Sequence, residues 1–87
     1  MSLENESAWA REKAELQALA TNIIREHQNE PQEELFKLME ELKREETTGE
    51  VARLMSDWSQ KKRMLLQDQI YWSLSKEDQE KYLDFIK

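Results

Sequence analysis

The stretch WAREKAELQALATNII, residues 9–24, decides the fold. Trp9, Leu16 and Ile23 recur in it every seven residues, and the other large apolar residues fall beside them. Apolar residues at this spacing share one side of an α-helix, while the charged residues between them face water. The pattern predicts a long amphipathic helix over residues 3–27.

Three breaks divide the rest of the chain into further helical stretches. Pro31 fits the start of a helix, and Ser73-Leu74-Ser75 interrupts another. In the Thr47-Thr48-Gly49 segment, either Gly49 ends a helix or Thr48 caps the next one. Asp78 follows Ser75 at the spacing of a capping box, so a last helix begins there. The helices expected between these breaks cover residues 31–46, residues 50–72 and the residues after Ser75.

The helix expected over residues 50–72 repeats the seven-residue spacing of the first one. Val51, Trp58, Leu65 and Trp72 fall at this interval and would form one stripe on a continuous helix. Two long apolar stripes exceed what one small chain can cover by itself. The pattern therefore predicts self-association, in which a second copy covers the stripes in an antiparallel homodimer.

Length and composition limit the fold class. The 87 residues suit a single helical domain over residues 1–87, and one glycine with one proline nearly excludes a sheet protein full of tight turns. We expect an all-α fold: a small helical bundle of three to four helices in a long-short-long-short order, which can also form a dimeric helical hairpin bundle. A chain this small buries only about 60–65% of its unfolded surface, so its stability as a monomer would be low.

The residue types that enzyme and metal sites need are scarce. The chain has no cysteine and a single histidine, His27, whose place near a helix end favours a capping role. Metal sites need clustered ligands, and phosphate-binding loops need several glycines, so we expect no metal, no cofactor and no catalytic residue. No apolar run approaches the roughly 18 residues of a membrane span. We therefore expect a cytoplasmic protein that is not an enzyme.

Charge is divided unevenly along the chain. Residues 1–50 hold 13 acidic and 6 basic residues, whereas residues 51–87 hold 6 acidic and 7 basic ones, for a net charge of −6. Lys61, Lys62 and Arg63 concentrate the positive charge and are candidates for contact with phosphate or with an acidic partner. However, three adjacent residues spread over about 200° of a helix, and an acidic chain repels a phosphate backbone. We therefore do not expect nucleic-acid binding as the main function.

Aromatic residues mark the expected contact surface, because tyrosine and tryptophan are enriched in interface hot spots. Tyr71 and Trp72 point about 100° apart on a helix, so one neighbouring helix cannot bury both equally. Either one of them faces a partner, or Phe85 and Ile86 of the last helix cover them. The residues expected at a partner interface or self-interface are Trp9, Leu16, Ile23, Trp58, Leu65, Tyr71 and Trp72.

These observations predict a small acidic helical protein that acts through protein–protein contact. It would serve as an adaptor, a regulator or a helical subunit, and it would self-associate. The alternative is a small nucleic-acid-associated regulator that uses the basic residues 61–63 of the third helix. No resemblance to a known family is evident in any segment.

Overall fold

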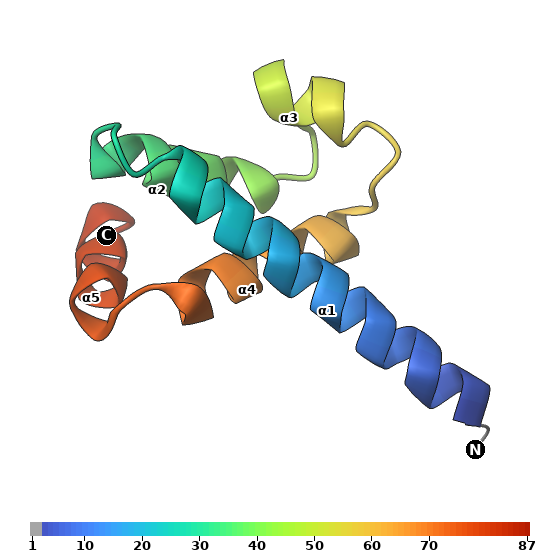
Figure 1. The fold of residues 1–87 in the computed structure, drawn as a ribbon. Coiled ribbons are helices and arrows are strands. Elements are labelled where there is room, and N and C mark those ends of the chain that lie inside the picture. Colours follow the sequence, from blue (N-terminus) through green and yellow to red (C-terminus); the bar gives the residue numbers. More distant parts are fainter. Residues whose placement is uncertain (1–2) are drawn as a thin grey trace.

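The computed structural model describes the backbone of residues 3–87 and the side chains of residues 10–87. Every regular element in this part of the chain is a helix (Figure 1). The helices, in chain order, are α1 (Leu3–Glu26), α2 (Gln32–Leu42), α3 (Gly49–Leu54), α4 (Gln60–Ser73) and α5 (Lys76–Phe85). The expected all-α fold is thus confirmed, and a small helical bundle describes it.

The first helix is the longest element, and only part of it is packed. From Leu16 onward, α1 buries its apolar side, including Ala20, against the rest of the chain, and Ile23 and Ile24 are partly buried there. Residues 10–15 are all exposed, and the N-terminal half of α1 projects beyond the other helices (Figure 1). The projection accounts for much of the elongated 43 × 28 × 24 Å shape. The predicted helix over residues 3–27 is confirmed, but its apolar side from Leu16 onward is covered within the chain.

The second helix supplies the centre of the core. It buries four apolar side chains, which are Leu35, Phe36, Met39 and Leu42, and Leu38 is partly buried beside them. Pro31 is the N-cap residue rather than the first helical residue, and the helix ends at Leu42 rather than near Glu46. At this end the Arg63 side chain from α4 binds the carbonyl oxygens of residues 42, 44 and 45.

The prediction of one continuous helix over residues 50–72 is wrong. The chain leaves the helical path at Met55 and turns, with the Trp58 N–H donating to the Met55 carbonyl at 3.0 Å. Helix α4 then starts afresh at Ser59, whose hydroxyl accepts a hydrogen bond from the Lys62 N–H at 3.1 Å. Because Ser59 is a strong N-cap residue, a new helix start here is locally favoured. The turn separates Val51 from Leu65 and Trp72, so the expected seven-residue stripe does not lie on one helix.

The register of α4 after this turn decides which of its residues are inside. Leu66 and Ile70 are fully buried and form the core side of α4 together with the polar residues Arg63 and Gln67. Helix α4 runs alongside α1 in the same direction, because Glu12 lies near Ser59 at one end and other α1 residues lie near Ser73 at the other. Leu65 and Trp72 consequently point away from the core.

The last helix packs across the end of the bundle. Ser75 caps α5 as predicted, since its hydroxyl accepts a hydrogen bond from the Asp78 N–H at 3.2 Å. Tyr82 is buried, and its ring packs edge-on against Phe36 of α2 with centroids 5.4 Å apart. Gln79 donates to the carbonyl oxygens of Tyr71 and Leu74, which ties α5 to the end of α4.

Candidate interaction surface

The solvent-exposed side of α4, which borders α1 at Leu65, carries exposed apolar residues. We call this side the α4 outer face, and it consists of Lys61, Met64, Leu65, Asp68 and Trp72. Its large apolar members keep much of their surface in water: Met64 is 45% exposed, Leu65 42% and Trp72 71%. Residues 61, 65, 68 and 72 follow the helical repeat, so they align along one side of α4. The face joins two charges and three apolar side chains on one surface.

The two adjacent aromatic residues at the end of α4 divide between the inside and the outside, as their 100° separation predicts. The half-buried Tyr71 ring packs near Tyr82, at a centroid distance of 5.8 Å. Trp72 meets the Tyr71 ring edge-on at 5.1 Å and is otherwise open. Phe85 and Ile86 are themselves 38% and 39% exposed and leave Trp72 uncovered. Trp72 is therefore the most exposed large apolar side chain of the α4 outer face.

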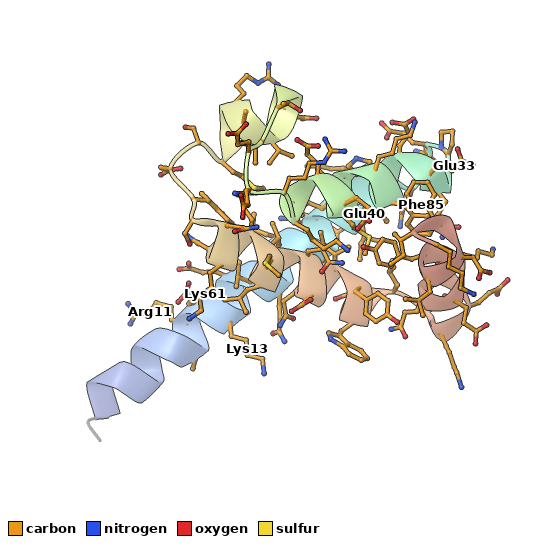
Figure 2. The ribbon with its side chains drawn as sticks, turned by 180° about the vertical axis from the view of Figure 1, so that it is seen from behind. Arg11, Lys13, Glu33, Glu40, Lys61 and Phe85 are labelled. Carbon is orange, nitrogen blue, oxygen red and sulfur yellow. The ribbon has the colours of Figure 1, made fainter. Side chains whose placement is uncertain are left out.

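A shallow groove borders the α4 outer face where α1 passes over α4. It is lined by Glu12, Lys13, Leu16, Leu65 and Gln69. Figure 2 shows Lys61 at the start of α4, at the end of the molecule where the projecting half of α1 carries Arg11 and Lys13. The apolar surface of α4 thus continues toward α1.

The three basic residues at positions 61–63 do not form one surface. Lys61 is exposed, whereas the Lys62 ammonium lies over the Trp58 ring, 4.2 Å from its centroid. Arg63 is only 4% exposed. Consecutive residues on a helix point in different directions, so the core side of α4 takes one of the three. Arg63 cannot contact a phosphate or an acidic partner without leaving the core.

The Arg63 side chain completes the C-terminus of α2. Its guanidinium donates to the carbonyl oxygens of Leu42 at 3.1 Å, Arg44 at 2.6 Å and Glu45 at 3.3 Å. The last carbonyls of a helix lack intrahelical partners and carry partial negative charge, so a cation there is stabilising. The planar guanidinium suits this role because it presents several N–H donors in a fixed arrangement. Arg63 is therefore a structural residue that joins α4 to α2.

A second polar network links α2, α4 and α5, and the sequence patterns did not predict it. The Tyr82 hydroxyl donates to the Glu40 carboxylate at 2.6 Å and accepts from the Gln67 amide at 3.1 Å. Lys43 pairs with the same carboxylate and lies over the Tyr82 ring, 5.6 Å from its centroid. Figure 2 shows Glu40 near the end of the bundle where α5 packs. A buried tyrosine needs a partner for its hydroxyl, which is the signal that could have indicated this network.

The network shifts the pKa values of its members. Burial disfavours the charged form of Glu40, but hydrogen bonds from Lys43 and Tyr82 outweigh it and lower the pKa of the carboxyl group. Burial and the nearby carboxylate raise the pKa of Tyr82. Burial opposes the charge of Lys43, yet its bond to Glu40 leaves the pKa raised. The pair is therefore ionised at neutral pH and holds the tyrosine in its protonated form.

The other residues expected at an interface lie in different places. Leu16 is buried in the core, and Ile23 and Trp58 are partly buried against it. These three residues pack within the chain. The side chain of Trp9 lies outside the described residues. Of the seven expected positions, Leu65 and Trp72 share the α4 outer face, and Tyr71 lies half-buried beside Trp72.

The single histidine has local partners. One ring nitrogen of His27 lies 2.7 Å from the Ile23 carbonyl oxygen, and the other lies 3.7 Å from the Glu30 carboxylate. Both contacts are within four residues, at the end of α1. Among residues 10–87, no group of three or more histidine, cysteine or acidic side chains is placed to hold a metal ion.

Searches for relatives and for membrane segments give negative results. No protein-family model matches the sequence, and no curated protein or solved structure is significantly similar to it. Within the described part of the chain, no helix combines the length and the apolar character that crossing a membrane requires.

Proposed function

We propose that this protein acts through protein–protein contact and not as an enzyme, and that the α4 outer face is its contact surface. The observation that carries the proposal is the exposure of Trp72, at 71%, on the same side of α4 as Leu65 and Met64. Single exposed apolar side chains are common on protein surfaces. Here three lie on one side of a helix, and one of them is a tryptophan, a residue type that is enriched in interface hot spots.

The energetics agree with this role. Fully burying an apolar side chain of this size contributes about 1.5–3 kcal/mol, and much of that contribution is unused at Trp72 and Leu65 in the single chain. A partner that covered the α4 outer face would recover it. An adaptor, a regulator or a helical subunit would each use the face in this way, and the proposal includes self-association as a homodimer.

The nucleic-acid alternative has less support. Arg63 binds carbonyl oxygens at the C-terminus of α2. Only Lys61 and Lys62 of the basic segment remain for contact with phosphate, and Lys62 lies over the Trp58 ring. A net charge of −6 adds long-range repulsion from a phosphate backbone. The cytoplasmic location expected from the sequence stays a prediction.

Site-specific photo-crosslinking tests the proposal. A photoreactive phenylalanine analogue is placed at Trp72 or, as a control, at Leu54, which is 61% exposed on α3. We expect position 72 to form protein adducts in cell lysate that excess wild-type chain suppresses and excess Trp72→Glu chain does not. Position 54 should form none. Equal labelling at both positions, or adducts with nucleic acid alone, would contradict the proposal.

A further inference from the structure

The α4 outer face carries one positive and one negative charge, on either side of its apolar centre. Lys61 and Asp68 lie seven residues apart, about 10 Å along the helix axis, and Met64 and Leu65 lie between them. Both charged side chains are exposed, and neither makes a salt bridge or a hydrogen bond within residues 10–87. This arrangement differs from the ion pairs on α2 and α5, which close within one turn of their own helix.

This pattern is complementary to itself in one orientation. A two-fold axis between Met64 and Leu65 places two α4 helices antiparallel, with Lys61 of each copy opposite Asp68 of the other. The same axis places Met64 of each copy opposite Leu65 of the other. A parallel arrangement would instead put lysine against lysine and aspartate against aspartate. In a two-fold interface every contact occurs twice, so the charge pattern strongly favours the antiparallel form.

We infer that the occupant of the α4 outer face is a second copy of this chain, bound antiparallel through two Lys61–Asp68 pairs around Met64 and Leu65. The inference rests on the proposed function and names its partner. In this orientation Trp72 of one copy reaches the start of α4 in the other copy. There it meets the region where α1 passes Ser59 and begins to project.

The size of the face sets the expected strength of the dimer. Helix α4 has 14 residues and spans about 21 Å. This length by itself presents less than the roughly 800 Å² per partner of a standard interface. We therefore expect a reversible dimer that forms at micromolar or higher concentrations, with the projecting half of α1 adding to the contact.

Charge-reversal variants at positions 61 and 68, tested singly, in one chain and as a mixture, test the pairing. Lys61→Glu places two acids opposite each other, and Asp68→Lys places two lysines opposite each other, at two symmetric positions in each case. We expect either single variant to weaken dimerisation by about tenfold or more. The double variant should restore it. An equimolar mixture of the two single variants should also dimerise, because the glutamate introduced at position 61 of one chain then meets the lysine introduced at position 68 of the other. At the second symmetric position of this mixed dimer, a native Asp68 meets a native Lys61.

The readout is the solution mass by light scattering over a hundredfold range of concentration. The matched controls are Lys76→Glu and Glu80→Lys, which make the same charge changes at exposed positions of α5. Thermal melts followed by circular dichroism establish that each variant folds. We expect wild type and both controls to rise from 10.5 kDa toward twice that mass, and the single variants to stay near the lower value.

Several outcomes overturn the inference. A wild-type mass that stays at 10.5 kDa excludes the dimer. A dimer that the single charge reversals leave unchanged has another interface, and a mixture of folded single variants that stays monomeric excludes the antiparallel pairing. If the wild-type chain stays monomeric but crosslinks at position 72 to a different protein, the inference fails and the proposed function is still supported. The failure of the inference and the failure of the proposed function are thus distinguishable.

Discussion

The substitution Arg63→Met tests the interior of the fold most directly. Methionine keeps an unbranched apolar stem but removes all three hydrogen bonds from the guanidinium to the carbonyls of Leu42, Arg44 and Glu45. The bond to Leu42 is buried, so its carbonyl oxygen would lose its partner in a region that excludes water. The other two carbonyls are partly exposed and can bind water instead.

The magnitude follows from these differences. A buried polar group left unsatisfied costs about 1–3 kcal/mol, and each hydrogen bond to a charged group contributes about 1.5–3 kcal/mol. The variant no longer has to bury the charged guanidinium, and the saved desolvation cost offsets part of this loss of stability. We expect the free energy of unfolding to fall by about 2–4 kcal/mol. A domain of this size has only about 4–13 kcal/mol in total, so the melting temperature should fall by roughly 10–25 °C.

Urea denaturation followed by circular dichroism measures this change. Lys76→Met is the matched control, since it also removes one positive charge but from an exposed position, and it should stay within about 0.5 kcal/mol of wild type. Arg63→Lys should fall between the two, because one ammonium group cannot serve three carbonyls in a fixed plane. A loss below about 1 kcal/mol for Arg63→Met would refute the assignment of Arg63 as the residue that completes α2.

Three further changes test the local structure. Tyr82→Phe removes the hydroxyl between Glu40 and Gln67 and should lower the free energy of unfolding by about 1–2 kcal/mol, whereas an unchanged urea midpoint would contradict the network. The pKa of Glu40 is lowered in the folded state. The ionised carboxylate therefore stabilises the fold above the ordinary pKa of a glutamate, and this stabilisation is lost as the pH falls through the folded pKa. When the melting temperature is measured at decreasing pH, it should fall less for Glu40→Gln than for wild type. Ser59→Ala removes the N-cap of α4 and should cost about 0.5–2 kcal/mol, whereas an equal effect from Ser73→Ala would show that the cap is not responsible.

Local sequence signals predicted a large part of the helical structure. The repeat of apolar residues placed α1, and the Ser75–Asp78 spacing placed the start of α5. These signals succeed because they depend on residues that are close together in the chain and lie on one helix. Ser59 carries the same kind of signal, whereas the seven-residue repeat over residues 51–72 predicts one continuous helix. That repeat came from residues on both sides of a turn.

The candidate surface was predicted only in part. The sequence indicated that Tyr71 and Trp72 could not be buried together, and Trp72 is indeed open. It did not show that Leu16, Ile23 and Trp58 are used within the chain, or that the side of α4 with Leu65 and Asp68 is open to solvent. These outcomes depend on the register of α4 after the turn at residues 55–59, which rotates every side chain of the helix together.

By itself, the sequence determined that the protein is helical, where most of its helices begin, and that it carries a net negative charge. These properties follow from composition and from interactions between near neighbours in the chain. The tertiary structure decided which face of α4 is open, where α2 ends and how α5 is held. The contacts responsible join residues far apart in the sequence: Arg63 reaches carbonyls 18–21 residues away, and Tyr82 reaches Glu40 over 42 residues. Periodicity within a helix carries no information about such partners, because they are selected only when the helices pack.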